Sequence, residues 1–388
     1  MSLWEGFGLT PIINAYGTNT RLSGGPLAPE VAAAMVEASR ASVDILDLQA
    51  AACREIARAT GAEAGIATAG ASAALLLGTA AILARLDAAA MDRLPRTEAE
   101  FLIARSQRNM YDRAVEVAGA RLVEVGIPDR VAGAGVRDAT AAEFAAAITP
   151  ATRGILWVAQ PHSEPPLPEL VEMARAHGLP VLVDAAAQLP PAANLRRFIT
   201  EGADLVAFSG GKAIGGPQAS GILAGRADLV ASALMQMLDL DLPAAQFRPP
   251  VEFAAARQLS HLPRHGIGRS CKVGREEVAG LLVALRRFTR DTAADRAARW
   301  SARLDAVQAG LPAALTTSRI LAGEVPMLAL HLPDADAARA LEARLRQGHP
   351  AAHLNPSRIR DGLLLINPIA LADADAPRLA TLVTEALA

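Results

Sequence analysis

The sequence predicts an α/β protein with a mostly parallel seven-stranded sheet, helices on both faces, and a small C-terminal α/β domain. Short apolar runs alternate with helical stretches through the first two thirds of the chain, which is the pattern of βαβ units. The chain is rich in alanine, leucine and valine and poor in aromatic residues, a composition that suits helices and buried parallel strands. Its 388 residues exceed the ~250–300 that one hydrophobic core normally holds.

Most of the predicted elements lie in a large domain that covers residues 26–245. Residues 1–25 are broken by Pro, Asn and Gly, and we expect an irregular N-terminal arm there. Two helices follow, over residues 29–42 and 48–61. We expect the seven strands at residues 64–68, 100–105, 121–125, 154–159, 181–184, 205–209 and 221–224. Helices fit between several of them, at residues 71–86, 110–118, 141–148, 168–176 and 195–201.

The pattern changes after about Leu242, and residues 246–388 are predicted as a connector, a long helix and a small C-terminal domain. The connector is rich in proline and contains a short helix at residues 251–259. One long helix is expected from about Lys272 to Ala297 or beyond. The tail then predicts a strand at 326–332, a helix at 335–347, a hairpin through 353–367 and a closing helix from 376.

Composition excludes several classes of function. The net charge is −2 and no basic block is present, so we expect no nucleic-acid surface. The two cysteines follow no pattern and are read as reduced thiols of a cytoplasmic protein without a signal peptide. The most apolar stretch, residues 67–86, is rich in small residues, with Glu63 before it and Arg85 near its end. It predicts a buried helix, and we expect no membrane association.

A lysine in a glycine-rich turn is the most informative feature. Residues 208–218 read FSGGKAIGGPQ and follow an apolar strand, so Lys212 stands in a turn with little bulk around it. Lysine forms Schiff bases once its pKa is lowered by desolvation. Asp184 closes another apolar strand. Each residue alone fits a simpler role, as a solvated lysine or a helix cap. Together they predict a pyridoxal 5'-phosphate (PLP) site, which needs such a lysine and a carboxylate for the pyridine nitrogen.

A phosphate site is predicted where the strand at 64–68 leads into a helix. Gly70, Ala71 and Ser72 are small, so a ligand can approach the backbone N–H groups at the helix N-terminus. Ser209, three residues before Lys212, is expected to donate to the same phosphate. Ligands of parallel sheets bind beyond the carboxyl ends of the strands, which is where these residues fall.

Three further residues are candidates for contact with the cofactor. Ala186 is small enough to pack against the ring, and Gln188 either bonds the ring hydroxyl or caps the following loop. His162 follows a strand and either contacts the ring or substrate as a catalytic residue, or is a surface histidine. The other histidines have no metal-ligand spacing, and we predict no metal.

An amino-acid substrate needs its carboxylate held, usually by the fork of an arginine side chain. The candidates are Arg21 in the N-terminal arm, Arg108 after a strand, and Arg358 or Arg360 in the predicted C-terminal hairpin. Arg358 is preferred, because a hairpin of a small domain can close over a cofactor.

The chain resembles the selenocysteine synthase-like family. The resemblance is carried by residues 208–222 around Lys212, by the opening IINAYG at 12–17, by TGAEA at 60–64 and by KVGREE at 272–277. It implies a fold-type I, aminotransferase-like architecture, a PLP aldimine at Lys212, and an active site at the interface of a homodimer or higher homo-oligomer.

Within this family the chain is most similar to the subgroup that contains D-glucosaminate-6-phosphate ammonia-lyase. The shared stretch is VDAAAQLPP at 183–191, followed by NLR at 194–196. Two departures from that subgroup are Gln107, where a histidine is expected, and Arg21. Both are expected to line the substrate pocket.

These features predict a PLP-dependent lyase for a small amino acid or amino sugar acid. Lys212 or His162 removes the α-proton, and loss of a β-substituent then leads to a keto acid and ammonia. A racemase or epimerase shares the first steps and reprotonates the other face. A PLP-binding protein without turnover is the third hypothesis.

Overall fold

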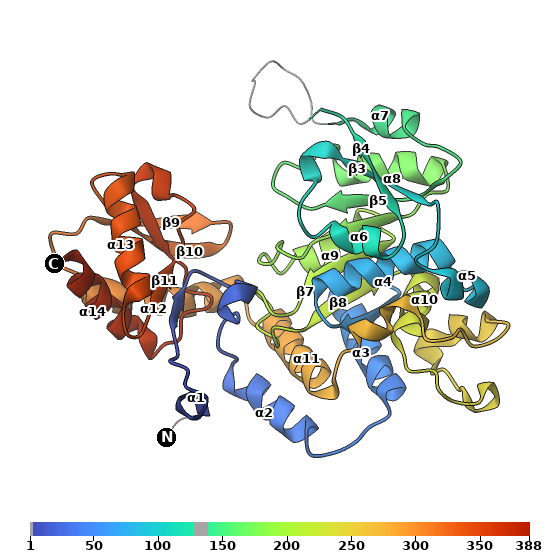
Figure 1. Ribbon diagram of the computed structural model, residues 1–388, viewed down its shortest axis with the longest axis horizontal. Helices are drawn as coiled ribbons and strands as arrows, with labels where there is room; N and C mark the ends of the chain where they lie inside the picture. The colour runs from blue at the N-terminus through green and yellow to red at the C-terminus, as the bar shows by residue number, and fades with distance from the viewer. Residues whose placement is uncertain (1–2, 128–138) are drawn as a thin grey trace. The chain divides into compact units, whose positions relative to one another are not determined.

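The computed structural model describes residues 3–127 and 139–388. By packing, the chain divides into a large unit, Pro29–Phe288, and a small unit, Met1–Ala28 with Thr289–Ala388 (Figure 1). The three-part division expected from the sequence stays a prediction, since packing alone does not define folding domains.

The large unit contains the seven-stranded sheet that the sequence predicts. Its order is β2-β8-β7-β6-β5-β3-β4. The strands are β2 (Ala64–Thr68), β3 (Glu100–Ala104), β4 (Arg121–Val125), β5 (Thr152–Val158), β6 (Val181–Asp184), β7 (Leu205–Ser209) and β8 (Gly221–Gly225). β8 runs antiparallel to both neighbours, and the other pairs are parallel. The carboxyl ends of β2, β7, β6, β5, β3 and β4 therefore meet at one edge, as predicted.

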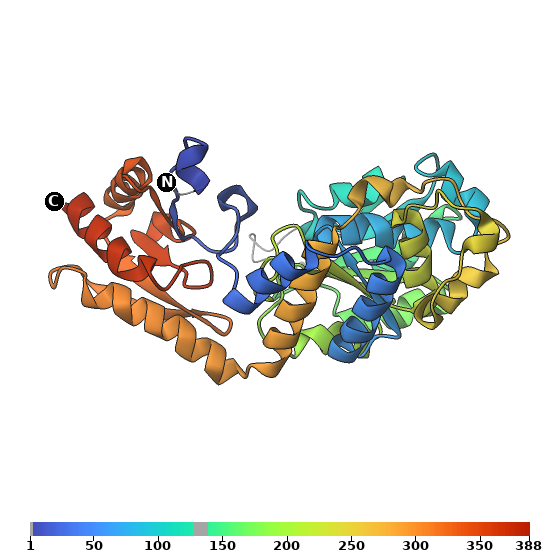
Figure 2. The same cartoon turned by 90° about the horizontal axis from the view of Figure 1, so that it is seen from below.

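Helices cover both faces of this sheet (Figure 2). On one face, Gly78 of the helix at Ala71–Ala84 lies against Leu182 and Leu223. On the opposite face, Ile56 of the helix at Ile45–Thr60 lies against Gly65. The helices of the large unit are α2 (Pro29–Ala38), α3 (Ile45–Thr60), α4 (Ala71–Ala84), α5 (Ala88–Arg93), α6 (Arg113–Val117), α7 (Ala141–Ala146), α8 (Leu167–Ala176), α9 (Asn194–Thr200), α10 (Ala227–Met237) and α11 (Arg275–Arg290). Short 3-10 turns lie at η2 (Arg105–Gln107), η3 (Ala244–Gln246), η4 (Val251–Gln258) and η5 (Ile267–Cys271).

The alanine-rich stretch forms α4, which is buried almost all round, as predicted. A helix that is apolar on every side must lie inside the protein. Within residues 3–127 and 139–388, no helix combines the length and the apolar character needed to cross a membrane.

The prediction of one helix from about Lys272 to Ala297 is wrong, because the chain forms α11 and then α12 (Ala293–Ala309). Thr292 begins α12 with a capping box. Its hydroxyl accepts from the backbone N–H of Asp295 at 3.1 Å, and the Asp295 carboxylate accepts from the Thr292 N–H at 2.9 Å. This reciprocal cap satisfies N–H groups that a continuous helix would not leave free.

The small unit contains a three-stranded antiparallel sheet, β12-β10-β9, and a parallel pair, β1 with β11. Its elements are α1 (Leu3–Gly6), β1 (Ile13–Ala15), η1 (Thr20–Leu22), α12, β9 (Thr317–Ala322), β10 (Val325–His331), α13 (Ala335–Gln347), β11 (Ala352–Leu354), η6 (Ile359–Asp361), β12 (Leu363–Ile366) and α14 (Asp375–Leu387). The predicted hairpin through 353–367 is wrong. β11 pairs with β1, β12 pairs with β10, and the described contact between the two arms is one bridge, Asn355 with Leu365.

Candidate cofactor and active site

Lys212 lies in the loop that joins two neighbouring antiparallel strands, β7 and β8. The loop closes where the N–H of Gly210 donates to the carbonyl of Ser220 at 2.9 Å. A Cβ on Gly210 would meet the Ser220 hydroxyl at 2.3 Å. The N–H of Gly215 donates to the Lys212 carbonyl at 2.9 Å, and Gly215 has a φ of +77°. Close packing therefore requires glycine at position 210, and the positive φ of a turn requires it at 215. Together the two glycines fix the backbone that carries Lys212.

Asp184 ends β6 at the same edge, paired in register with Ala207 of β7. Its side chain is buried, with 7% of the residue exposed, and one carboxylate oxygen accepts from the N–H of Ala186 at 3.0 Å. Burial raises the pKa of Asp184, while the Ala186 N–H and the charge of Lys212 oppose that rise. Burial lowers the pKa of Lys212, and the charge of Asp184 opposes that fall. An acid and a lysine with shifted pKa values thus interact at this edge.

The turn between β2 and α4, called the anion cradle below, lies at the same edge of the sheet and has free space and, among the described residues, uncapped N–H groups that would suit an anion. Gly70 caps α4 with a φ of +110°, and the space beside its Cα is open. The first N–H groups of a helix have no acceptor within it, and no side chain of the described residues caps α4. Thr68 holds the turn, because its hydroxyl donates to the Gly70 carbonyl at 2.9 Å. Ala71 and Ser72 supply the next N–H groups at the helix N-terminus, where a negative charge is favoured.

One residue of β8 aligns this cradle with the lysine loop. Gly221 is the register partner of Thr68 on β2 and of Ser209 on β7. A Cβ on Gly221 would meet the Gly70 carbonyl carbon at 2.4 Å, so only glycine allows this approach. Gly70, after β2, and Ser209 and Lys212, at and after the end of β7, thereby lie at the same edge of the sheet on the two strands that flank β8, the edge at which the sequence predicts them.

His162 lies in a tight turn, Gln160–Ser163, beyond the end of β5. The N–H of Ser163 donates to the Gln160 carbonyl at 3.3 Å, and the Ser163 hydroxyl accepts from the Gln160 N–H at 2.9 Å. The residue before the turn, Ala159, donates its N–H to the Asp184 carbonyl at 2.9 Å. The turn is therefore tied to β6, and the exposed His162 stands at the edge that carries Asp184.

Two predicted contact residues use their amides inside the protein. Gln188 donates its amide to the Ala159 carbonyl at 2.7 Å. Gln107 is fully buried, accepts from the Val158 N–H at 2.8 Å and donates to the Glu164 carbonyl at 2.9 Å. The structure thus shows that both side chains hold the segment around His162, and their contacts with cofactor or substrate stay predictions.

The arginine candidates differ in how far their charges are already paired. Arg108 forms ion pairs with Asp112 and Glu124 in the large unit. Arg358, in the small unit, forms an ion pair with Asp361. Arg21, also in the small unit, has a guanidinium without a hydrogen bond or ion pair to any residue in the described part of the chain. Of the three, Arg21 is the most available for an anionic ligand, which weakens the preference for Arg358.

Three residues at the site were not predicted from the sequence, because they hold the backbone rather than carry chemistry: Thr68, Ser163 and Gly221. Ser163 stands beside His162, and the small Gly221 opens a strand, but neither signal identifies its partner. Among the described residues, no group of His, Cys, Asp and Glu is arranged to hold a metal ion.

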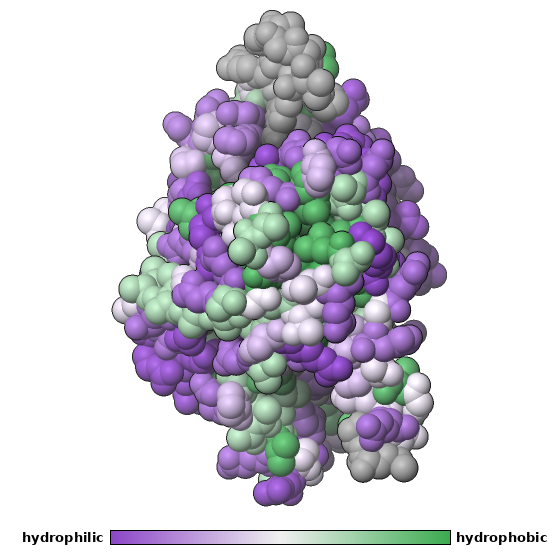
Figure 3. Space-filling model, turned by 90° about the vertical axis from the view of Figure 1, so that its left-hand side faces the viewer, coloured by the Kyte–Doolittle hydropathy of each residue, from purple (hydrophilic) through white to green (hydrophobic). Residues whose placement is uncertain are grey.

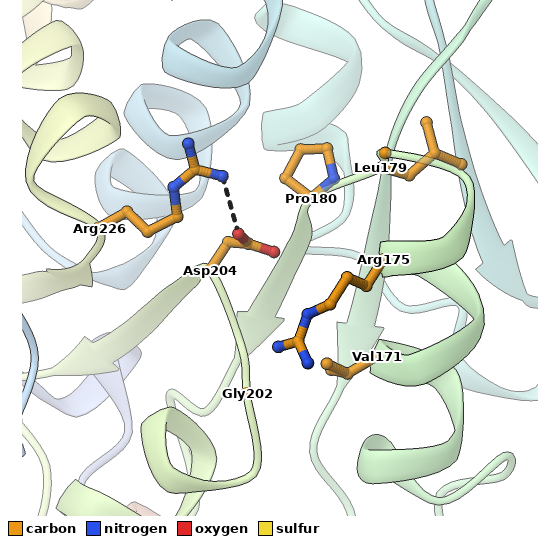
Figure 4. Close-up of a pocket in the computed structure, with 8 residues that line it drawn as sticks. Val171, Arg175, Leu179, Pro180, Gly202, Asp204 and Arg226 are labelled. Carbon is orange, nitrogen blue, oxygen red and sulfur yellow. Dashed lines mark hydrogen bonds and ion pairs between the residues drawn. The ribbon is translucent and has the colours of Figure 1, made fainter.

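A pocket of about 190 Å³ lies at the other edge of the sheet, where β6 and β7 begin (Figure 4). Figure 4 shows Arg226 facing the carboxylate of Asp204, at 3.1 Å. That carboxylate also accepts from the Val181 N–H at 2.9 Å, so its role is to tie strand ends together.

The sheet order, the lysine loop and the acid on the neighbouring strand define the α/β, fold-type I aminotransferase-like class. A serine palmitoyltransferase structure from S. paucimobilis shares this fold, with a TM-score of 0.51, 16% identity, and coverage of 97% of this chain and 87% of that one. The chain belongs to the family described as "SelA: L-seryl-tRNA selenium transferase", which matches residues 12–242.

Individual relatives carry different activities. A 5'-C-glycyluridine monooxygenase-decarboxylase from Streptomyces sp is 31% identical, over 95% of this chain and 88% of the relative. The D-glucosaminate-6-phosphate ammonia lyase of Salmonella typhimurium is 27% identical, over 96% of this chain and 95% of the relative. A solved structure of D-glucosaminate-6-phosphate ammonia-lyase has a TM-score of 0.78 at 26% identity, covering 100% of this chain and 98% of that one. The chain is therefore similar to enzymes, including a lyase.

Proposed function

We propose that this protein is a PLP-dependent lyase that deaminates a small amino acid or amino sugar acid by α,β-elimination. The observation that carries the proposal is the interacting pair of the buried Asp184 and the half-buried Lys212, at the same edge of the sheet as the N-terminus of α4, which no side chain within residues 3–127 and 139–388 caps. The similarity to ammonia lyases over nearly the whole chain supports the reaction type.

The described residues fit the cofactor. Lys212 would bind it covalently, and Asp184 would face its ring nitrogen. The N–H groups at Gly70, Ala71 and Ser72, with the Ser209 hydroxyl, would hold its phosphate, and Ala186 would pack against the ring. When bound, PLP supplies an electron sink for charge that develops at the substrate α-carbon.

The chain's own residues would then move protons and hold charge. Burial lowers the pKa of Lys212, so its amine can accept a proton nearer neutral pH than a free lysine can. Burial raises the pKa of Asp184, and a cation beside the carboxylate, such as the ring nitrogen, would favour its ionised form. His162 stands at the same edge and is proposed as the second proton-transfer residue. Arg21 or Arg358 would hold the substrate carboxylate.

The 31% identical monooxygenase-decarboxylase favours a second candidate, oxidative decarboxylation of a glycine-like α-amino acid. Racemisation or epimerisation is the other alternative within the same chemistry. The products separate them: ammonia and a keto acid without oxygen uptake for the lyase, oxygen uptake with carbon dioxide for the decarboxylase, and loss of chirality alone for the racemase.

We also propose that the protein is a homodimer or a higher homo-oligomer. Exposed apolar side chains support this: Met110 and Tyr111 beyond β3, and Val36 and Val43 near α2. Figure 3 shows hydrophobic side chains gathered in patches on the face that it presents. Light scattering on the purified protein tests this proposal, and a monomer at micromolar concentration would contradict it. A cytoplasmic location stays a prediction.

The visible absorption spectrum tests the function. Purified protein with PLP is titrated with D- and L-amino acids and amino sugar acids, under air and under nitrogen, and ammonia is assayed. A band of lysine-bound cofactor that changes with one compound and releases ammonia without oxygen supports the lyase. A protein that shows no such band after PLP is added is not a PLP enzyme of this type.

A further inference from the structure

We propose that Gln107 is a positioning residue, which fixes the turn carrying His162 against Asp184 and so sets how His162 meets the cofactor. This inference rests on the proposed function. It goes beyond it by assigning to a buried glutamine, remote from Lys212 in sequence, a role in the reaction.

The amide of Gln107 spans the two ends of one segment. Its oxygen accepts from the N–H of Val158, the last residue of β5, and its nitrogen donates to the carbonyl of Glu164, just before α8. Gln107 has no exposed surface. The bond to Val158 is buried and the bond to Glu164 is part-buried, so loss of the amide would leave the buried Val158 N–H unpaired and release the Glu164 end of the segment.

Further hydrogen bonds within the protein hold the segment between Val158 and Glu164. The Ser163 hydroxyl donates to the Val158 carbonyl at 2.6 Å, and the Trp157 ring nitrogen donates to the Pro165 carbonyl at 3.0 Å. Gln188 holds the Ala159 carbonyl, and the Ala159 N–H reaches the Asp184 carbonyl. The backbone around His162 is therefore connected by hydrogen bonds to the residue proposed to face the cofactor ring.

These hydrogen bonds hold the backbone around His162, the proposed proton-transfer residue, in one position. His162 is exposed, and an exposed side chain on a free loop would sample many positions. Binding and catalytic groups need a fixed location, which neighbouring residues supply through packing and hydrogen bonds. Gln107, in the 3-10 turn η2 after β3, fixes the location of His162 because its amide bonds to both ends of the segment.

Gln107→Met is the direct test, because methionine keeps the length and removes both hydrogen bonds. Gln49→Met is the matched control. Gln49 is equally buried and makes the same pair of bonds, to the N–H and carbonyl of Ala67, both at 3.0 Å, but it joins α3 to β2. Amide hydrogen exchange is measured on the full chain without cofactor. Gln107→Met should speed exchange of residues 159–166 about tenfold or more, while Gln49→Met leaves that segment unchanged.

A double-mutant cycle on PLP affinity then shows whether Gln107 acts through His162. The dissociation constant is measured by absorbance for wild type, Gln107→Met, His162→Ala and the double variant. We expect each single variant to bind about tenfold more weakly, and Gln107→Met to change the His162→Ala value less than about twofold. For the control, the fold-changes that Gln49→Met and His162→Ala cause in the PLP dissociation constant should multiply in the double variant. Independent effects of Gln107 and His162, or unchanged exchange at 159–166, would overturn the inference.

A substitute variant and the cofactor band of the wild-type protein allow each outcome to be interpreted. If Gln107→Met does not fold, Ser163→Ala removes two bonds of the same turn at a half-buried position and replaces it in both measurements. If wild-type protein shows no band of lysine-bound cofactor, the proposed function has failed. If the band is present and the cycle is additive, only the role of Gln107 has failed.

Discussion

The charges of Asp184 and Lys212 stabilise each other at a place where burial opposes both of them. Burial raises the pKa of the acid, which the Ala186 N–H and the charge of Lys212 oppose, and burial lowers the pKa of the lysine, which the charge of Asp184 opposes. The pair is therefore poorly satisfied without a ligand. A ligand with a cationic nitrogen for Asp184 and a carbonyl carbon for Lys212 would relieve both groups.

Replacement of Lys212 by methionine should make stability less dependent on pH. In cofactor-free protein the folded-state pKa of Lys212 lies below its unfolded value of ~10.4. Between those two pKa values the unfolded chain binds more protons, so the Lys212 contribution to the free energy of unfolding rises with pH. Lys212→Met should therefore be more stable than wild type at pH 7, with a gap that narrows toward pH 10. Urea unfolding at several pH values measures it, and a constant gap would contradict the assignment.

Asp184→Asn should separate stability from activity. Asparagine keeps an oxygen for the Ala186 N–H but loses the charge that faces the ring nitrogen. Because the folded-state pKa of Asp184 is raised, its contribution to the free energy of unfolding falls as pH rises past the unfolded-state pKa of ~3.9 and stays low above the folded-state pKa. The cofactor-free variant should therefore be at least as stable as wild type at pH 7. Turnover should fall by at least ~10²-fold, the size of one preorganised electrostatic contact. An active Asp184→Asn enzyme would remove Asp184 from the mechanism.

Gly221→Ala should weaken cofactor binding more than its effect on stability explains. The added methyl group would press on the Gly70 carbonyl carbon and shift the turn that begins α4. We expect a loss of ~1–3 kcal/mol in stability, typical of an overpacked site. Gly154→Ala is the matched control, since its methyl group would meet the Phe101 ring at 2.9 Å. PLP titrations of both variants should show weaker binding for Gly221→Ala alone, and equal affinities would argue against a phosphate cradle at Gly70.

Arg21→Gln should raise the KM for substrate more than Arg358→Gln does. The Arg358 charge is already paired with Asp361, whereas the Arg21 guanidinium has no partner among the described residues. A bidentate contact with a carboxylate is worth enough to change KM by ~10-fold or more. Steady-state kinetics on the compound found by the spectral titration measure both variants. A larger effect at Arg358 would restore it as the preferred carboxylate ligand.

The central sheet was predictable from sequence because its strands are locally marked. β6 and β8 are short apolar runs, and breakers stand on both sides of each. Lys212 and Asp184 were predicted as site residues for the same reason, since Lys212 follows such a run and Asp184 ends one. The carboxyl ends of parallel strands meet at one edge, so their proximity follows from topology rather than from any contact visible in the sequence.

Pairings between distant segments were not predictable. β1 joins β11 across more than 330 residues, and nothing in IINAYG identifies that partner. Gln107 was predicted in the substrate pocket, yet its amide closes a segment some 50 residues later. Side-chain hydrogen bonds to backbone have no sequence periodicity, so buried glutamines and serines that position a site leave no local signal. The break before α12 did leave one, the capping box at Thr292 and Asp295.

The pairing of Thr68 and Ser209 with Gly221 sets the distance between the anion cradle and the lysine loop. The anion cradle and the lysine loop lie on strands that flank β8, so their backbones are two inter-strand spacings apart, about 9–10 Å. The backbone hydrogen bonds between these strands fix this interval. A molecule engages both ends only if its own anion and its electrophilic carbon suit that span. In the proposed function, cofactor choice would therefore depend on the spacing of the sheet as well as on the residues that touch the ligand.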